Sequence, residues 1–218
     1  MPSVASERGD ALGMRGRHWA RVDVVKDWRF WGLVPIITVT SIFGTALFFQ
    51  QVHLADVKGL EHRDIVRLFP VYTITTGVAA VLSGLAVDRW GAVQLLPIIP
   101  IPMAVGFAIM GLSNAEAALM VGFMLVGLTG GIYGTVQGAF WPEIYGTRFI
   151  GAIKALATAL MVIGSAIGPA LTGWGIDAGV NFPQQMIWYA VYMVVIAVWS
   201  VFVVTRIWPD LKPSAAAV

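Results

Sequence analysis

The chain has 218 residues, of which 58% are apolar and 12% charged, and its formal net charge is +2. Soluble domains carry about 25% charged residues, and a chain of this length cannot bury so much apolar surface in one water-soluble core. This composition excludes a soluble enzyme domain, a disordered chain and a nucleic-acid-binding protein, and it places the chain in a lipid bilayer. The sequence contains no cysteine, which excludes disulfides, thiol catalysis and Cys-ligated metals.

Residues 1–29 are hydrophilic and rich in arginine. We expect them to form a cytoplasmic N-terminal arm, either disordered or partly an interfacial helix whose Trp19, Val22 and Val25 face the lipid. No apolar run stands ahead of Phe30, so we expect no cleaved signal peptide.

Six apolar runs follow, each long enough to form a helix across a hydrocarbon core about 30 Å thick. They lie at residues 30–51, 66–86, 92–112, 117–140, 150–175 and 185–206. Because short connections join them, residues 30–206 are predicted to form one six-helix transmembrane bundle, and residues 207–218 a cytoplasmic tail. The predicted fold class is therefore an all-α membrane protein.

The cations are sorted between the connecting segments. Of the 14 Lys and Arg residues, eleven fall on the side of the two termini, and the other three are Lys58, Arg63 and Arg67. Cytoplasmic loops of membrane proteins carry an excess of Lys and Arg. We therefore expect both termini to be cytoplasmic, in a membrane that we take to be the bacterial cytoplasmic (inner) membrane.

A short motif recurs at the ends of the second and fifth runs. Residues 82–88 read LSGLAVD and residues 171–177 read LTGWGID, so four of the seven positions are identical or pair Ser with Thr. By the predicted orientation the two copies end on opposite sides of the membrane. The motif therefore predicts two three-helix repeats of inverted topology, which is typical of secondary transporters; chance similarity is the alternative.

The loop between the second and third runs reads Gly84-Leu85-Ala86-Val87-Asp88-Arg89-Trp90-Gly91. It resembles the Gly-x-x-x-Asp-Arg-x-Gly signature at the cytoplasmic ends of the second and eighth helices of the major facilitator superfamily (MFS). The resemblance implies that Gly84, Asp88, Arg89 and Gly91 form a conformational latch, made in one state and broken in the other. The plainer interpretation is a turn with a helix-capping Asp. Residues 92–94 lack the basic side chains that commonly follow in the family, so we expect a weaker latch.

A second stretch extends the resemblance. Residues 141–151 run from Trp141-Pro142-Glu143 to Gly151, and Gly164-x-x-x-Gly168-Pro169 follows. This region is similar to the tenth and eleventh helices of bacterial MFS members. The resemblance implies an MFS half-bundle, the C-terminal half formed by helices seven to twelve. It also implies that a first half is supplied by a second copy or by a separate six-helix partner.

Glycines recur every fourth residue in the fourth run, and small residues also mark the fifth run. Such stripes allow close approach of helices in lipid, so we expect them to form packing and sliding surfaces. The expected packing residues are Gly130, Gly134, Gly138, Gly164, Gly168 and Pro169.

Polar side chains on the runs that correspond to cavity-lining helices in the family are the candidate solute contacts. Hydrogen bonding that serves only helix packing is the competing interpretation. The candidates are Thr45, Tyr72, Thr76, Tyr133 and Gln137. No charged residue lies near the middle of a run, so any coupling carboxylate would have to come from a partner half.

Motifs for catalysis are missing from the sequence. It has no His-Glu-x-x-His and no phosphate-binding loop, and His18, His53 and His62 lie outside the apolar runs. We expect neither an enzyme nor a bound cofactor or metal. The expected function is secondary transport of a small organic solute by alternating access, with a carboxylate-type metabolite as first choice and an amphipathic efflux substrate as second. A truncated or split-gene fragment without transport activity, and a six-span channel or scaffold, stay open as alternatives.

Overall fold

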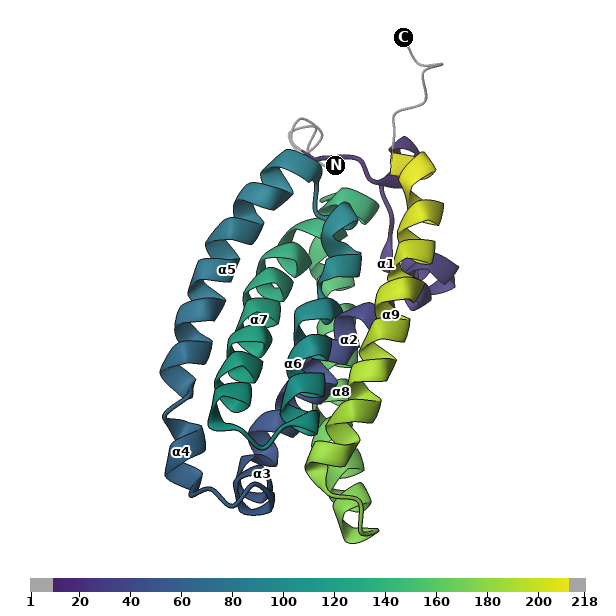
Figure 1. The fold of residues 1–218 in the computed structure, drawn as a ribbon. Helices are drawn as coiled ribbons and strands as arrows, with labels where there is room; N and C mark the ends of the chain where they lie inside the picture. The colour runs from purple at the N-terminus through teal and green to yellow at the C-terminus, as the bar shows by residue number, and fades with distance from the viewer. Residues whose placement is uncertain (1–9, 212–218) are drawn as a thin grey trace.

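The computed structural model describes residues 10–211, and all regular structure in that range is helical (Figure 1). Six helical segments are long and apolar enough to cross a bilayer, as predicted, which makes the chain an integral membrane protein. The observed segments are Trp28–Phe49, His62–Trp90, Val93–Leu112, Glu116–Tyr145, Ile150–Asp177 and Phe182–Leu211.

The spans are built from long helices and a few short ones that extend or connect them. In chain order the elements are η2 (Met14–Gly16), α1 (Arg21–Lys26), α2 (Trp28–Phe49), α3 (Gln51–Val57), α4 (His62–Val66), α5 (Phe69–Trp90), η3 (Val93–Ile98), α6 (Pro100–Leu112), α7 (Glu116–Tyr145), α8 (Ile150–Asp177) and α9 (Phe182–Leu211). The third span starts as the 3₁₀-helix η3, which contains Pro97, and continues as α6.

Sharp turns end two of the long helices. Gly91 follows α5 with φ +83°, and Gly146 follows α7 with φ +77°. A left-handed backbone of this kind costs least at glycine, and it is a common way to stop a helix. The chain can therefore reverse direction within a few residues and return through the bilayer.

The helices pack in three principal pairs: α2 against α8, α5 against α7, and α6 against α9. The α5 and α8 spans are the least covered, since only 17% of the most apolar window of each is buried, compared with 39–50% in the other four. A broad apolar surface on these two helices is thus left for lipid or for another protein.

Glycine packing occurs where α7 meets α5 and where α8 meets α2, but it uses only part of the predicted stripe. A Cβ atom on Gly168 would lie 2.8 Å from the carbonyl carbon of Ile42, and one on Gly164 would lie 3.1 Å from the side chain of Ile42. On α7 a close approach to α5 occurs at Gly131, where a Cβ atom would lie 2.6 Å from that of Ala79. Pro169 adjoins the α2 contact, whereas Gly130 meets only the side chains of α5 residues.

The prediction that Gly134 and Gly138 pack against a neighbouring helix was wrong. A Cβ atom at either position would have no neighbouring atom within 4 Å. The physical reason is the rotation of α7, because the residues that face α5 are Gly127 and Gly131, which lie on an adjacent stripe. Gly134 and Gly138 instead border a pocket.

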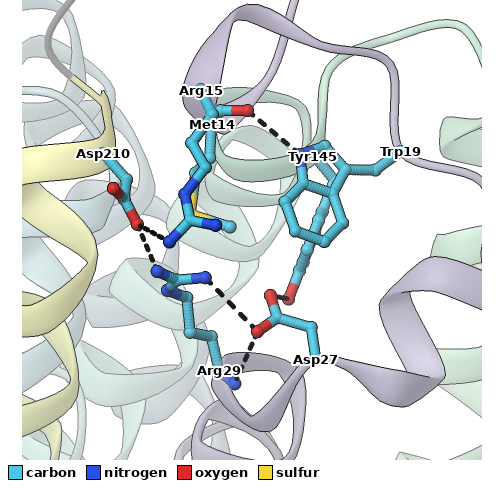
Figure 2. A network of polar contacts seen from close by, with 7 residues as sticks. All are labelled: Met14, Arg15, Trp19, Asp27, Arg29, Tyr145 and Asp210. Carbon is cyan, nitrogen blue, oxygen red and sulfur yellow. Dashed lines mark hydrogen bonds and ion pairs between the residues drawn. The ribbon is translucent and has the colours of Figure 1, made fainter.

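The described part of the N-terminal arm packs onto the bundle from Ala11 onward and includes the short helix α1, so it differs from the expected arm mainly at Trp19. Trp19 is 4% exposed, its ring meets Tyr145 edge to face at 5.4 Å, and its indole N–H donates to the Met14 carbonyl at 3.1 Å (Figure 2). The prediction that Trp19 faces lipid was therefore wrong, because the end of α7 offers it an aromatic site. Val22 and Val25 are exposed.

Charged residues join the arm to three helices at the same end of the bundle (Figure 2). Arg29, at the start of α2, pairs with Asp27 and with Asp210 of α9, while Arg15 lies 3.3 Å from Asp210. The Tyr145 hydroxyl, at the end of α7, donates to Asp27 at 3.4 Å. Because Arg29 is 8% exposed, this cluster ties the ends of α2, α7 and α9 together in a poorly hydrated place.

The bundle limits also differ from the predicted ones. The first span begins at Trp28 and the last continues to Leu211, beyond the expected end at residue 206. Residues 1–9 of the predicted arm and 212–218 of the predicted tail lie outside the described residues.

The first described residues and the end of α9 lie at the same end of the bundle, together with the α5–η3 and α7–α8 connections (Figure 1). Most described cations lie at or near this end. Lys58 belongs to the opposite end, where it is 9% exposed and donates to the Ser113 carbonyl at 2.7 Å; its burial lowers the pKa of its ammonium group.

Candidate functional site

A polar pocket lies between the last three turns of α7 and the first turns of α8. Its volume is about 210 Å³. The lining residues are Gly134, Gln137, Gly138, Trp141, Lys154 and Thr158. Four of these carry side-chain hydrogen-bond donors, Lys154 is the one charged residue among them, and none carries a carboxylate.

The pocket is hollow because two of its wall positions have no side chain. Gly134 and Gly138 lie one turn apart on the same face of α7, and both face open space. Any larger residue at either position would extend into the pocket. Gly134 and Gly138, which were predicted to pack against a neighbouring helix, instead leave the space that the pocket occupies.

Proline fixes the position of the single charge in the pocket. In an α-helix the carbonyl of Gly138 would accept from the backbone N–H of residue 142, but Pro142 has no N–H. The Lys154 ammonium group donates to that carbonyl instead, at 2.9 Å. None of the ion pairs formed within residues 10–211 includes Lys154, so its charge is held beside α7 without a carboxylate partner.

Trp141 supplies an unused donor. It is 1% exposed, and its ring packs against Phe30, Phe140 and Tyr145 with centroid distances of 5.6, 4.4 and 6.1 Å. Its indole Nε1 is buried with no hydrogen-bond partner. A buried N–H left unpaired costs about 1–3 kcal/mol, so an acceptor that entered the pocket and reached it would be stabilised.

Gln137 and Tyr133 lie on the same side of α7 and both contact Met161 of α8. The Gln137 amide nitrogen lies 2.6 Å from the Met161 sulfur, and the Tyr133 hydroxyl lies 3.1 Å from it. Tyr133 also donates to the Ile37 carbonyl at 2.9 Å, which links α7 to α2. Of the five candidate solute contacts, Gln137 alone lines this pocket.

The remaining candidates are used within and between helices. Thr45 donates to the Ser41 carbonyl in its own helix at 2.7 Å. Thr76 donates to the Tyr72 carbonyl at 2.8 Å and, across to α7, to the Gly127 carbonyl at 3.1 Å. The Tyr72 ring packs edge to face on Phe48 at 5.2 Å. The hydroxyl groups of Thr45 and Thr76 therefore bond to backbone carbonyls, which agrees with the interpretation that they serve helix packing.

The predicted latch loop is held by a residue outside it. The carboxylate of Glu143, near the end of α7, accepts from the backbone N–H groups of Ala92 at 2.8 Å and Val93 at 3.3 Å. It thereby caps the start of η3, and a Cβ atom on Gly91 would lie 3.0 Å from it. Asp88 and Arg89 are exposed, and within residues 10–211 Asp88 has neither a hydrogen bond nor an ion pair. Gly84 has open space beside it.

Comparison with known proteins gives one informative similarity. No family model matches the chain. It is 27% identical over 157 residues to an uncharacterized 38 kDa protein in the 23S RNA operon of Thermoproteus tenax. The match covers 68% of the chain and 37% of that relative, so the chain spans little more than a third of the relative's length.

Sequence reasoning missed Trp141 and Lys154 as members of one site. Trp141 entered the sequence analysis only as part of the second MFS-like stretch, and Lys154 was not proposed as a candidate contact. The signal that could have joined them is Pro142, because a proline four residues after Gly138 leaves a carbonyl that needs another donor.

Proposed function

We propose that the chain is one half of a secondary active transporter of the major facilitator superfamily, which moves a small organic solute by alternating access. A carboxylate-type metabolite is the proposed class of solute. In this mechanism one bundle rocks against another around a site near the middle of the membrane, and no covalent chemistry takes place.

The observation that carries the proposal relates the sequence repeat to the helix contacts. In the repeated motif, Gly84 corresponds to Gly173, 89 positions later. The same offset relates Ala79 to Gly168 and Ile42 to Gly131. Ala79 meets Gly131 where α5 crosses α7, and Ile42 meets Gly168 where α2 crosses α8. One offset thus exchanges a close α5–α7 contact with a close α2–α8 contact, as is expected of an inverted repeat.

The pairing of whole helices has the same symmetry. If α2, α5 and α6 exchange places with α7, α8 and α9 in that order, the α2–α8 pair becomes the α7–α5 pair. The α6–α9 pair is converted into itself. This agreement supports two inverted three-helix units, the arrangement found in each half of MFS transporters.

A half-bundle needs a partner, because alternating access requires two bundles around one cavity. The chain spans 37% of its relative, and its α5 and α8 leave broad apolar surfaces uncovered. These facts support a second copy of the chain or a separate six-helix protein as the other half. They also favour the alternative of a fragment that is inactive alone.

Native mass spectrometry of the purified chain, followed by uptake assays in proteoliposomes with labelled mono- and dicarboxylates, tests the proposal. We expect a dimer and uptake that an imposed ion gradient drives. A monomer that takes up none of the solutes would contradict independent transport and favour the fragment alternative. Leakage of every small solute, without saturation, would favour a channel.

The proposed orientation, with both termini in the cytoplasm, has its own test. The sequence contains no cysteine, so single cysteines can be introduced without a background. We expect a membrane-impermeant thiol reagent to label Glu61→Cys in intact cells and to label Arg148→Cys only after the cells are opened. The reverse pattern would invert the proposed topology.

A further inference from the structure

The pocket between α7 and α8 is lined by one positive charge, that of Lys154, and by no carboxylate among the residues that the structure describes, and this limits what can bind there. Lys154 has three N–H donors and spends one on the Gly138 carbonyl. The Trp141 indole N–H is buried and unpaired. The Gln137 amide and the Thr158 hydroxyl complete the polar lining.

From this arrangement we infer that the pocket binds the oxyanion, carboxylate or phosphate, of a small solute. Hydrogen bonds between charged donors and anionic oxygens are about twice as strong as neutral ones. No described carboxylate lines the pocket, so a cationic ligand would have no charged partner there and would be repelled by Lys154. This inference rests on the proposed function, because it assigns the pocket to the path that the solute takes.

The bond to the Gly138 carbonyl distinguishes Lys154 from an ordinary surface lysine. With a rise of 1.5 Å per residue, Lys154 lies about 6 Å from the start of α8, and Gly134 lies about 16 Å from the end of α7. A lysine this close to a helix end usually extends toward water. Lys154 is instead held against α7, because the Gly138 carbonyl that Pro142 leaves without a partner accepts a hydrogen bond from its ammonium group.

Two glycines and one tryptophan then shape the space beside this charge. Gly134 and Gly138 keep the α7 wall open, with nothing within 4 Å of a Cβ atom at either position. Trp141 packs against Phe30, Phe140 and Tyr145, and its buried N–H becomes available to a ligand in the pocket only after a small shift of the side chains around it. The anion would receive a positive charge from α8 and a neutral donor from α7.

Isothermal titration calorimetry on the full chain in detergent tests the inference, with sodium succinate and inorganic phosphate as ligands and choline chloride as the cationic control. We expect at least one of the two anions to bind and choline not to bind. Lys154→Gln should weaken anion binding about tenfold or more, and Trp141→Phe, which keeps the ring, should weaken it by up to about tenfold.

Arg148→Gln is the matched control, because Arg148 is an exposed cation at the same end of the bundle and does not line the pocket. It should bind the anion as the wild-type chain does. Equal losses in Arg148→Gln and Lys154→Gln would indicate general surface charge and overturn the site. Unchanged binding in Lys154→Gln, or no binding of either anion by the wild-type chain, would overturn it as well.

A lipid headgroup is the other source of an oxyanion, and nanodiscs distinguish it. If phosphatidylglycerol stabilises the chain through Lys154 relative to phosphatidylcholine, while succinate and phosphate bind neither in detergent nor in nanodiscs, the solute site is overturned.

Uptake separates the inference from the proposed function. Anion binding that depends on Lys154 in a chain that transports nothing would support the inference and remove the transport proposal. If the chain transports a solute and Lys154→Gln leaves that uptake unchanged, the transport proposal would stand and the anion site at Lys154 would be overturned.

Discussion

Gly168 lies where α8 crosses α2, and replacing it with alanine should push these two helices apart. A Cβ atom there would lie 2.8 Å from the Ile42 carbonyl carbon and closer still to its oxygen. Ordinary Cβ contacts begin at 3.4 Å, so the backbones must separate locally by at least 0.6 Å. The clash involves backbone on both sides, so no side-chain rotation can relieve it.

The cost follows from the size of that separation. A gap of 0.5–1 Å forfeits roughly a quarter to a half of each dispersion contact across the interface, and overpacking of a core costs about 1–3 kcal/mol. Alanine recovers about 0.5–1 kcal/mol through its better helix propensity. We therefore expect a net loss of about 1–2 kcal/mol, or a fall in Tm of about 2–8 °C for a chain of this size.

Gly134→Ala is the matched control, since Gly134 also lies within a membrane-spanning helix but has nothing within 4 Å of a Cβ atom. Its stability should be unchanged or slightly raised. Both variants can be compared by thermal unfolding of the detergent-solubilised protein, monitored by circular dichroism. A Gly168→Ala protein as stable as Gly134→Ala would refute the close contact between α2 and α8.

Two further substitutions test the end of the bundle where the termini lie. Glu143→Ala removes the acceptor for the N–H groups of Ala92 and Val93 and should cost about 1 kcal/mol of stability, the usual value of a helix cap. Asp88→Ala should cost much less. If thermal unfolding shows the opposite order, Asp88 and not Glu143 stabilises this loop. Arg29→Gln leaves Asp27 and Asp210 partly buried without their shared cation and should cost about 3 kcal/mol. Loss of the exposed Arg206 should change stability by less than about 0.5 kcal/mol, and equal effects of the two arginine variants would show that burial adds nothing at Arg29.

The positions of the six spans could be predicted from sequence because lipid removes the alternatives. A backbone that crosses hydrocarbon must satisfy its hydrogen bonds within itself, so a long apolar run can only become a helix. The errors lie at the ends, where this constraint fades. α9 passes its expected end at residue 206 and reaches Leu211, because Asp210 pairs with Arg29 and thereby draws the last turn onto the bundle.

The glycine stripes show what periodicity leaves undetermined. Residues four apart share a helix face, and α7 carries two such glycine series, Gly127 with Gly131 and Gly130 with Gly134. The spacing identifies both faces but not the neighbour that either one meets. That assignment depends on the rotation of α7, which the packing of α5 decides. The series at Gly127 and Gly131 became the packing face, and the other became largely a pocket wall.

The pocket was harder still to predict. Its lining residues come from two helices, and the position of Lys154 depends on a backbone atom, the Gly138 carbonyl. Gln137 was identified as a polar residue in an apolar run, but the unpaired indole N–H of Trp141 is visible only once Phe30, Phe140 and Tyr145 surround it. The burial of Trp19 was also missed, because its aromatic neighbour Tyr145 comes from a distant part of the chain. Sequence patterns register which side chains are apolar, and they do not register which polar atom of a large aromatic residue is left without a partner.

The charge on Lys154 connects stability with binding. Lys154 is half-buried near the start of α8, donates to the Gly138 carbonyl, and pairs with no carboxylate among the described residues. An anion that binds only the folded chain must raise the stability of the fold according to its concentration relative to Kd. The same anion would relieve the unpaired N–H of Trp141. The lack of a carboxylate partner for Lys154 within the described residues is therefore the feature that favours an oxyanion over a cationic solute.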